Sequence, residues 1–355
     1  MNEIIVQERD IIVSGAGMLR RITLNRPRAM NALTLDMVIE ITRLLKAWHD
    51  DPEVCVVLLD GAGARGFCAG GDIRALYEGA RSGSDFPAIF WRDEYRLDAL
   101  IARYPKPVIA LMDGVVMGGG VGLAAYAAFR IVTERSAVAM PEVGIGFFPD
   151  VGASFLLARA PGSIGTYLAV SGTSIGAGDA IYCALADIHI PFATLADLPE
   201  ALSTCRTRDE VGSLLRKLSV QAPGGHLPAA RSWIDHCYAP DTVEEILERL
   251  NQCDDSGARE AFRVLETRSP TSLKVTLRHL RDAAAFERVE ECLRQDYRIA
   301  LACIRNQDFL EGVRAAVIDK DRNPRWHPAT VAAVTAEAVN RHFLPHGGTE
   351  LTFPD

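Results

Sequence analysis

The sequence predicts an α/β protein with a mainly helical C-terminal region, and three observations lead to this prediction. Residues 54–59 (VCVVLL) and residues 108–112 (VIALM) are short, continuous apolar runs, and a glycine-rich turn follows each of them at a short distance. Such runs are typical of strands in a parallel sheet that is covered on both faces. From residue 259 to about residue 343 the pattern is that of helices.

The chain begins with an alternating segment, residues 3–24, which predicts strands on either side of a turn at SGAGM. RITL then leads into Asn25-Arg26-Pro27, where the proline ends the strand. Residues 34–49 have apolar side chains at helical spacing, and Thr34 is a candidate N-cap. We therefore expect strands followed by a capped helix.

The first glycine-rich turn follows residues 54–59 and contains FCAGGDIR. Glycines let the backbone approach a ligand closely, because no Cβ intervenes. Asp72 comes directly after two glycines and before a helical stretch, so helix capping accounts for it fully. No phosphate-loop lysine follows either turn, and neither reads GxGxxG, which excludes nucleotide hydrolysis and dinucleotide binding.

The second turn, MGGGVGL, opens a predicted small-residue helix over residues 118–128. The unpaired N–H groups of a first helical turn and the helix dipole favour an oxyanion. Alternatively, the three glycines only allow tight packing of helix on sheet, and the motif alone leaves both interpretations open. Two turns at the carboxyl ends of parallel strands could face one another across a cleft.

Two carboxylates, Glu142 and Asp150, lie in the segment MPEVGIGFFPDVG with two phenylalanines between them. An isolated acidic residue in a loop is most often solvated or caps a helix. An apolar neighbourhood, however, would raise a carboxyl pKa towards neutrality, as general acid–base catalysis requires. Glu94, in WRDEY, stands among charged residues on a predicted helix, so an exposed ion-paired face explains it equally well.

These segments together resemble the crotonase (enoyl-CoA hydratase/isomerase) superfamily, and more narrowly its 3-hydroxyisobutyryl-CoA hydrolase subgroup. The resemblance is carried by NRPRAMNAL, FCAGGDIR, WRDEY, MGGGVGL and MPEVGIGFFPDVG, and towards the C-terminus by SPTSLKVT, NQDFLEGVRA and IDKDRNPRW. It implies a crotonase-like ββα spiral core in residues 1–190, with the CoA site and oxyanion hole. It also implies a mainly helical C-terminal region, residues 191–355, packing on that core.

The resemblance also implies roles for individual residues. The N–H groups of Ala69 and Gly119 would form an oxyanion hole for the thioester carbonyl oxygen of an acyl-CoA. Glu142 and Asp150 would be catalytic, with Glu142 acting either as general base on water or as a nucleophile that forms a mixed anhydride. The substrate-binding residues would be Glu94, Gly70, Gly71, Asp72 and Ile73.

One position separates hydrolase from hydratase. Hydratases of the superfamily have a glutamate three residues after the middle glycine of the GGG turn, and here that position is Gly122. Only the second hydratase glutamate is matched, by Glu142. The resemblance thus implies hydrolysis of a short branched β-hydroxyacyl-CoA, with 3-hydroxyisobutyryl-CoA the leading substrate, as in valine catabolism. A hydratase/isomerase-type lyase and a non-catalytic acyl-CoA-binding protein are the alternatives.

A serine triad is a further possibility in the C-terminal region. His279 and Asp296 could be combined with Ser269, but no GxSxG elbow supports a nucleophilic serine. Ser269 and Thr271 stand beside Pro270, which is typical of a helix start.

Composition limits the partners and cofactors. A net charge of −8, spread without long runs, indicates neither nucleic acid nor an anionic membrane as a partner, and no apolar run reaches about 18–20 residues. Eight scattered cysteines, without CxxC or His–Cys metal spacing, predict reduced thiols and no metal site. CoA is part of the substrate, so no separate cofactor is expected.

The N-terminus shows no presequence pattern, so a cytoplasmic location is expected. The resemblance also makes a homo-oligomer possible.

Overall fold

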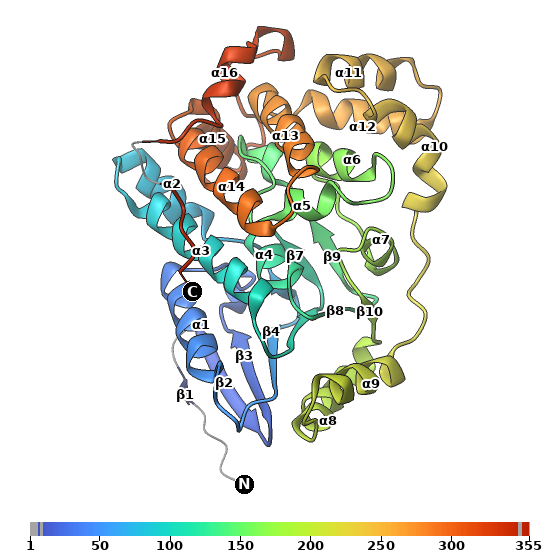
Figure 1. Ribbon diagram of the computed structural model, residues 1–355. Helices are drawn as coiled ribbons and strands as arrows, with labels where there is room; N and C mark the ends of the chain where they lie inside the picture. The colour runs from blue at the N-terminus through green and yellow to red at the C-terminus, as the bar shows by residue number, and fades with distance from the viewer. Residues whose placement is uncertain (1–5, 8–9, 347–349, 355) are drawn as a thin grey trace. The chain divides into compact units, whose positions relative to one another are not determined.

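The computed structural model describes residues 6–7, 10–346 and 350–354, and it is a mixed α/β structure with a helical C-terminal region (Figure 1). Residues 3–5 and 8–9 of the predicted N-terminal strands lie outside the described residues. The strands are β1 (Val6–Gln7), β2 (Ile11–Ala16), β3 (Leu19–Leu24), β4 (Val56–Gly61), β5 (Gly66–Cys68), β6 (Val108–Met112), β7 (Val115–Met117), β8 (Phe129–Val132), β9 (Ala137–Ala139) and β10 (Ile188–His189).

Helices are interspersed among the strands up to β10, and after β10 the described elements are all helical. The first group is η1 (Pro27–Ala29), α1 (Leu35–Trp48), α2 (Ile73–Ser82), α3 (Phe86–Arg103), α4 (Gly119–Ala125), η2 (Glu142–Ile145), α5 (Ala153–Leu157), α6 (Ile164–Ser171) and α7 (Ala177–Tyr182). The second is η3 (Phe192–Asp197), α8 (Leu198–Ser203), α9 (Arg208–Leu218), α10 (Leu227–Tyr238), α11 (Val243–Gln252), α12 (Ser256–Glu266), α13 (Pro270–Ala283), α14 (Val289–Cys303), α15 (Gln307–Val313), η4 (Arg314–Ile318), η5 (Val331–Ala333) and α16 (Ala336–Arg341).

The larger sheet of the described residues has the strand order β1-β2-β3-β4-β6-β8-β10. β2 and β3 pair antiparallel around the predicted turn, whereas β3, β4, β6, β8 and β10 are parallel neighbours. Residues 56–59 of β4 are fully buried between β3 and β6. Their continuous apolar character thus follows from a strand that is covered on both faces, as predicted.

The smaller sheet, β5-β7-β9, carries the two glycine-rich turns. β5 is parallel to β7, so the turn after Cys68 and the turn after Met117 begin at the same edge of this sheet. The helix predicted over residues 118–128 is shorter, since α4 ends at Ala125 and β8 begins at Phe129.

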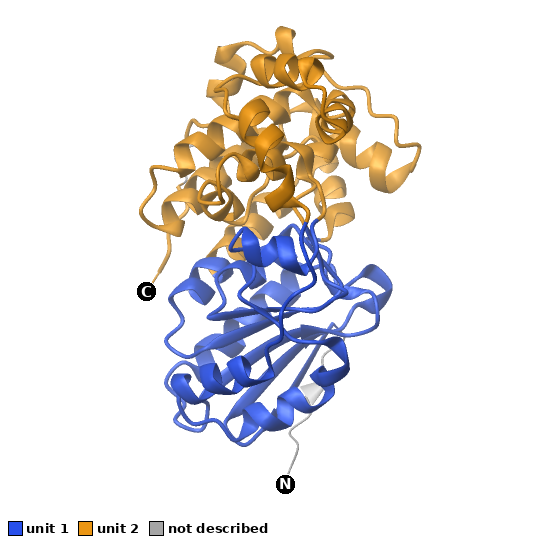
Figure 2. Cartoon of the chain, turned by 90° about the vertical axis from the view of Figure 1, so that its right-hand side faces the viewer, with its two compact units in different colours: residues 1–71, 97–138, 175–225 blue, residues 72–96, 139–174, 226–355 orange. Residues whose placement is uncertain are grey.

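The chain forms two compact units, which Figure 2 colours separately. Unit 1 contains residues 1–71, 97–138 and 175–225, and unit 2 contains residues 72–96, 139–174 and 226–355. This differs from the expected division into consecutive parts, residues 1–190 and 191–355. The reason is that α2, α5 and α6 pack against the C-terminal helices α13 and α15, so these earlier segments belong to unit 2.

Side-chain caps fix several helix ends at the predicted places. The Thr34 hydroxyl accepts a hydrogen bond from the Met37 N–H (3.2 Å) at the start of α1. Ser269 caps α13 by accepting from the Ser272 N–H (3.1 Å), with Pro270 as the first helical residue. Among the described helices, none combines the length and the apolar character that crossing a lipid bilayer requires.

Candidate active site

The first glycine turn rests on the loop NRPRAMNAL of unit 1. The Asn31 side chain is buried; its amide donates to the carbonyls of Ala62 and Gly66 (3.0 Å each), and its oxygen accepts from the Arg26 N–H (2.9 Å). The loop in turn holds the glycine turn, because the Ala69 N–H donates to the Met30 carbonyl (3.0 Å). This corrects the expected role of Ala69. Its N–H is occupied by a backbone carbonyl and so is not presented to a substrate.

The N–H group of Gly71, two residues after Ala69, is oriented differently from that of Ala69. Gly71 pairs with Leu33 in an isolated parallel bridge, in which the Leu33 N–H donates to the Gly70 carbonyl (2.8 Å). In a bridge of this register the bonds involve the neighbours of Gly71, so the Gly71 N–H itself points away from Leu33. Gly71, which the sequence assigns to substrate binding, is therefore better placed than Ala69 to donate to an oxyanion.

The second glycine turn lies directly against the first within unit 1. Gly118 is the N-cap of α4 with φ 50°, and Gly119 is the first helical residue, whose N–H has no partner within the helix. Gly70 has φ 104°, and a Cβ added to it would lie 3.5 Å from the Gly119 nitrogen. The two turns thus lie in direct contact, so the N–H groups of both are close enough to serve one ligand atom.

The segment after Gly71 begins unit 2. The Asp72 carboxylate accepts from the Ala75 N–H (3.3 Å), which makes Asp72 the N-cap of α2, as the sequence predicts. Ile73 is the first residue of α2 and is half-buried. Capping accounts for the position of the Asp72 side chain, and a role in binding CoA stays a prediction for both residues.

Glu142 opens the 3₁₀ turn η2 in unit 2 and is buried. Glycines let this turn pack closely on α15: a Cβ at Gly146 would lie 2.2 Å from the Asp308 carbonyl oxygen, and a Cβ at Gly312 would lie 2.3 Å from the Ile145 carbonyl carbon. Within the described residues, one carboxylate oxygen of Glu142, Oε2, has no hydrogen-bond partner. Such an oxygen in a buried place is available to water or to a substrate.

Aromatic rings supply the apolar surroundings that the sequence predicts for this segment. Phe147 stacks on Trp91 of α3 with ring centroids 5.1 Å apart and planes 14° apart. Phe309 of α15 packs against both rings, at 6.2 Å from Trp91 and 5.7 Å from Phe147. Burial, and after it the negative charge of Asp150, raise the pKa of Glu142 well above its usual range.

Asp150 is also buried, and its partner is a tyrosine of α3. The Tyr95 hydroxyl donates to Asp150 Oδ2 (2.6 Å), and Tyr95 itself is fully buried. Burial raises the pKa of Asp150 to about 7, although the hydrogen bond from Tyr95 acts in the opposite direction. A carboxyl group of this kind can accept or release a proton near neutral pH, as general acid–base catalysis requires.

Glu94 does not lie on an exposed ion-paired face. It is buried, at 3% exposure, while its neighbour Asp93 forms that face with Arg92 (2.8 Å) and Arg96 (3.7 Å). The charge of Glu94 contributes to the raised pKa of Tyr95, whose largest cause is burial. Glu94 therefore belongs to the same buried group of unit 2 as Tyr95 and Asp150.

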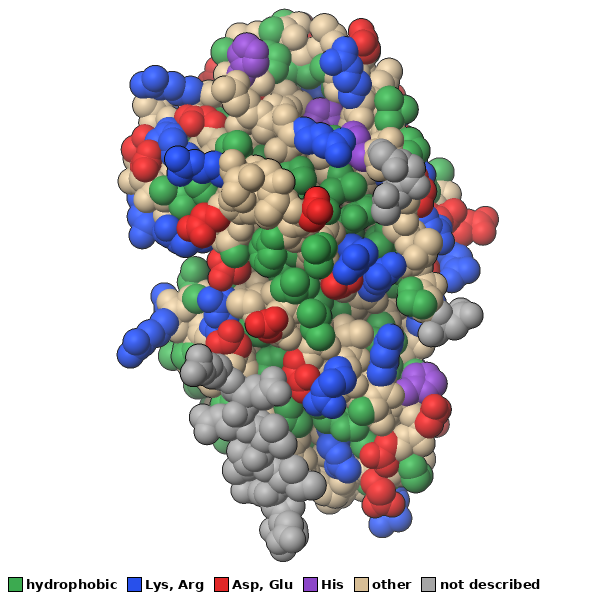
Figure 3. Space-filling view, turned by 90° about the vertical axis from the view of Figure 1, so that its left-hand side faces the viewer, with side chains coloured by type: hydrophobic (Ala, Val, Ile, Leu, Met, Phe, Trp, Pro, Cys, Tyr) green, Lys and Arg blue, Asp and Glu red, His purple; other side chains and the backbone are tan. Residues whose placement is uncertain are grey.

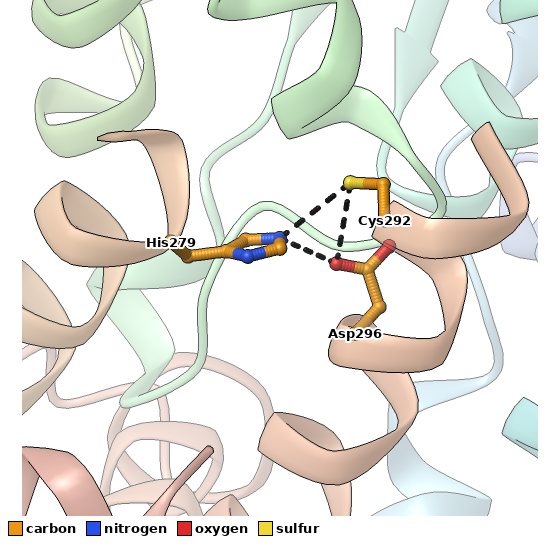
Figure 4. A group of neighbouring side chains, drawn as sticks. All are labelled: His279, Cys292 and Asp296. Atoms are coloured by element: carbon orange, nitrogen blue, oxygen red, sulfur yellow. Dashed lines mark hydrogen bonds and ion pairs between the residues drawn. The ribbon is translucent and has the colours of Figure 1, made fainter. Parts of the chain in front are cut away.

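Sequence reasoning missed Tyr95 as a partner of Asp150, although it is the residue after Glu94 in WRDEY. It considered His279 and Asp296 only as partners of Ser269 and missed Cys292, which joins these two in a buried group of the C-terminal region (Figure 4). Here His279 Nε2 lies 2.6 Å from Asp296 Oδ1. The spacing of the three residues in the sequence carries no known motif, so nothing in the chain alone indicated that Cys292 joins them.

The serine triad considered from the sequence is not formed. The Ser269 hydroxyl donates to Asp308 Oδ2 (2.6 Å) and caps α13, which accounts for it structurally. Asp308 also accepts from the His327 N–H (2.7 Å). The pair of His279 and Asp296 thus exists without a nucleophilic serine.

Curated relatives support the hydrolase subgroup. The chain is 39% identical over 351 residues to "3-hydroxyisobutyryl-CoA hydrolase, mitochondrial" of Homo sapiens, covering 97% of this chain and 91% of the human protein. The Mus musculus protein of the same name is 40% identical over 339 residues, covering 94% and 88%. These mitochondrial relatives overturn the expected cytoplasmic location. Reduced, buried thiols do not distinguish one reducing compartment from another.

Solved structures and a family comparison agree on the fold. A structure described as a carnitinyl-CoA dehydratase from Mycobacterium thermoresistibile has a TM-score of 0.93 and 44% identity, covering 98% of this chain and 99% of that one. One described as an enoyl-CoA hydratase from Rhodobacter sphaeroides 2.4.1 has a TM-score of 0.91 and 44% identity, covering 97% and 100%. Residues 19–343 match the family described as enoyl-CoA hydratase/isomerase. The crotonase-like fold is therefore confirmed, and the chain belongs to the enoyl-CoA hydratase/isomerase family.

Proposed function

We propose that this protein hydrolyses the thioester of a short branched β-hydroxyacyl-CoA, with 3-hydroxyisobutyryl-CoA as substrate, giving 3-hydroxyisobutyrate and CoA. The observation that carries the proposal is the buried pair Glu142 and Asp150 in unit 2, since both carboxyl groups have raised pKa values. Gly122 in place of a second hydratase glutamate supports it, as do the names of the vertebrate relatives.

The reaction needs a nucleophile at the carbonyl carbon and stabilisation of the oxygen. As the carbonyl carbon is attacked, negative charge develops on its oxygen, and the N–H groups of Gly71 and Gly119 are the donors we assign to it. Collapse of the intermediate then breaks the C–S bond, and the CoA thiolate leaves and takes up a proton. No metal or separate cofactor takes part, because CoA is part of the substrate.

Glu142 is the group that starts this sequence. Either its carboxylate removes a proton from the attacking water, or it attacks the thioester itself and forms a mixed anhydride that water then opens. A single turnover in ¹⁸O-water tests for the nucleophile. Label in the Glu142 carboxyl, found by mass spectrometry of its peptide, establishes the mixed anhydride, whereas label in the product acid alone is expected both from a general base and from an anhydride that water opens at the acyl carbon. A hydroxylamine quench separates these two cases, because only the anhydride gives a hydroxamate at Glu142.

Asp150 and Glu94 have supporting roles in the proposal. With a pKa of about 7, Asp150 can orient the water or the substrate hydroxyl and exchange a proton with it. Glu94 is assigned to the same hydroxyl group. The backbone of Gly70 and Gly71 and the first turn of α2, Asp72 and Ile73, are assigned to CoA, whose phosphates suit main-chain N–H donors.

A lyase is the second candidate, because the two solved structures with 44% identity are described as a dehydratase and a hydratase. The two functions differ in one product. A hydrolase releases free CoA, whereas a hydratase or isomerase changes the acyl chain and leaves the thioester intact.

The test is free CoA release, read by mass spectrometry, from 3-hydroxyisobutyryl-CoA, 3-hydroxypropionyl-CoA and crotonyl-CoA. We expect release from the hydroxyacyl esters and a loss of about 10²–10⁴-fold in Glu142→Gln. The matched control is Glu290→Gln, since Glu290 is another buried glutamate of unit 2 but is paired with Arg288 (2.9 Å), and this variant should keep its activity.

Three outcomes would contradict the proposal. Unchanged hydrolysis in Glu142→Gln would remove the assigned catalytic residue. Hydration or double-bond migration of crotonyl-CoA without CoA release would establish the lyase. Binding of the CoA esters without any turnover would establish a non-catalytic acyl-CoA-binding protein.

A further inference from the structure

Two C-terminal helices bring a histidine and an aspartate together in the interior of unit 2. His279 of α13 and Asp296 of α14 are both fully buried, and Nε2 of the histidine lies 2.6 Å from Oδ1 of the aspartate (Figure 4). Buried ionisable pairs are expensive to desolvate, so a contribution to stability does not by itself explain this one. Helix capping and surface solvation, which explain most such residues, do not apply to these two.

The second oxygen of Asp296 points to the segment that carries Asp150. Oδ2 accepts a hydrogen bond from the Gly152 N–H (2.8 Å). The backbone is strained at Val151, which has φ 52°, and Gly152 follows with φ 73°, a conformation that glycine adopts freely. A β-branched residue in the left-handed region is a rare outlier that persists only where the surroundings impose it. The hydrogen bond to Asp296 is one of the contacts that impose it.

The histidine contacts the same segment on the other side of Asp150. The ring of Phe148 meets the imidazole of His279 edge to face, with centroids 5.6 Å apart and planes 82° apart. Contacts to the pair therefore bracket Asp150, two residues before it and two residues after it. The carboxyl group of Asp150 is held between them by Tyr95.

We propose that His279 and Asp296 form a positioning pair for Asp150. The pair fixes the strained turn at residues 151–152, so that the Asp150 carboxyl keeps the orientation in which it receives the Tyr95 hydrogen bond. The charge of Asp296 also biases the proton on Asp150. This inference rests on the proposed role of Asp150 in hydrolysis, and it gives part of the C-terminal extension a function.

The electrostatics agree with this geometry. Burial is the main cause of the raised pKa of Asp150, and the charge of Asp296 raises it further. Burial also raises the pKa of Asp296, while His279 lowers it. The titratable groups that interact with Asp150 are Tyr95 from α3, Glu142 from η2, and Asp296 and Cys303 from α14.

Cys292 is the third member of the buried group, and its contacts leave the hydrogen bond between His279 and Asp296 in place. Its Sγ lies 3.8 Å from His279 Nε2 and 3.9 Å from Asp296 Oδ1. Burial raises the pKa of this thiol well above its usual range, so it stays protonated and acts as a weak donor. The much shorter contact between histidine and aspartate is that of a direct hydrogen bond.

The test is the pH dependence of hydrolysis in Asp296→Asn. The amide keeps the shape of the carboxylate and an oxygen for the Gly152 N–H but removes the negative charge. Without that charge the ionised form of Asp150 is less disfavoured, so the pKa of Asp150 falls. In the plot of hydrolysis rate against pH, the limb that is set by the ionisation of Asp150 should therefore move to lower pH, by about 1 pH unit. A role that is only structural would lower kcat and leave the limb in place.

Two further variants serve as controls, one expected to shift the limb in the opposite direction and one expected to leave it in place. In Tyr95→Phe the hydrogen bond that lowers the Asp150 pKa is lost, so the same limb should move to higher pH. In Asp308→Asn a different buried carboxylate of unit 2 is neutralised; it bonds Ser269 and the His327 N–H, so the limb should not move. An unmoved limb in folded Asp296→Asn, with Tyr95→Phe behaving as expected, overturns the proposal.

Two other measurements do not depend on activity. If Asp296→Asn does not fold, His279→Gln should show faster hydrogen exchange at the Gly152 amide than the wild type, and equal exchange overturns the positioning role. If Asp150→Asn keeps full hydrolysis, the catalytic role of Asp150 fails instead. A ¹³C-carboxyl NMR titration of Asp150 in the wild type and in Asp296→Asn then decides about the pair, with an equal pKa in both contradicting it.

Discussion

At the scale of single residues, the raised pKa that suits Asp150 to proton transfer also lowers the free energy of unfolding at neutral pH. Its pKa is about 7 in the folded chain and close to 4 in an unfolded one. Between these values the folded state binds the proton more tightly, so the free energy of unfolding falls as pH rises through this window. Ionisation of Asp150 at neutral pH therefore destabilises the fold.

The prediction is that Asp150→Asn is more stable than the wild type at pH 8, by a few kcal/mol, and close to it at pH 4. The amide cannot ionise, and it can still accept the Tyr95 hydrogen bond. Urea denaturation followed by circular dichroism at both pH values measures the difference. A variant that is less stable at pH 8 would show that ionised Asp150 is well solvated in the fold.

The same substitution at Asp60 is the matched comparison. Asp60 is also buried, but it accepts hydrogen bonds from Arg21 Nε (2.8 Å) and from the Thr23 hydroxyl (2.6 Å). Asp60→Asn removes one partner of an ion pair and leaves the other charged. We expect a loss of about 1–3 kcal/mol, opposite in sign to the change at Asp150.

At the scale of elements, the packing of α4 on β5 depends on one glycine. A Cβ at Gly120 would lie 2.4 Å from the Cys68 carbonyl oxygen and 2.8 Å from the Cys68 Cβ. Gly120→Ala should therefore destabilise the protein by about 1–3 kcal/mol through overpacking. It should also displace the GGG turn and weaken binding of acyl-CoA, which thermal unfolding and calorimetric titration measure.

Gly176→Ala is the control for that prediction. Gly176 lies in the same unit with φ −85°, and a Cβ there would meet nothing within 4 Å. Its replacement should leave both unfolding and CoA binding close to those of the wild type. Equal effects in the two variants would mean that close packing is not what Gly120 provides.

The segment that follows α15 is contacted at several points by one cation, Arg314. Arg314, at the start of the π-helical turn η4, lies 2.8 Å from Glu311, 2.7 Å from Asp319 and 2.8 Å from Asp321, and also donates to the Asn323 carbonyl (3.3 Å). These contacts fix the segment that follows α15, which has little regular structure of its own.

Arg314→Gln should therefore increase hydrogen exchange in residues 319–325. Arg341→Gln, which removes an exposed pair with Glu337 one helical turn away, should change exchange little, because pairs of this kind contribute little. Mass-spectrometric exchange on both variants checks this. No change in residues 319–325 of Arg314→Gln would assign their order to the surrounding backbone instead.

At the scale of the whole molecule, seven of the eight cysteines are buried, and Cys253 is partly exposed. Burial raises the pKa of buried thiols such as Cys183 and Cys237, to about 12 in both. Since the thiolate is the reactive form, we expect a thiol reagent at pH 7.5 to modify Cys253 first and the other seven only after unfolding. Intact-mass spectrometry counts the adducts, and rapid labelling of several native thiols would contradict the burial.

Charged side chains of both signs lie on one face of the molecule. On the face in Figure 3, Lys and Arg side chains alternate with Asp and Glu, without a large field of one sign. This matches a net charge of −8 that is spread along the chain without long runs. Assembly into a homo-oligomer stays a prediction.

Much of the fold follows from local patterns. The strand predicted at residues 108–112 coincides with β6, and Thr34 caps α1, because apolar runs and caps are encoded within a few residues. The burial of Glu142 and Asp150 also follows from their neighbours, since the aromatic residues lie beside them in the chain. The family resemblance then supplied the roles that are proposed for them.

The sequence by itself determined the fold class, the glycine turns, the buried carboxylates and the family. Only the tertiary structure decided that the Ala69 N–H is occupied by Met30, that Tyr95 bonds Asp150, and that Asp296 reaches the Gly152 N–H. It also decided the grouping of residues 72–96 and 139–174 with the C-terminal helices. The physical reason is the distance along the chain over which each feature is determined. A strand or a cap depends on adjacent residues, whereas a hydrogen bond between residues 55 or 144 positions apart depends on how the whole chain packs.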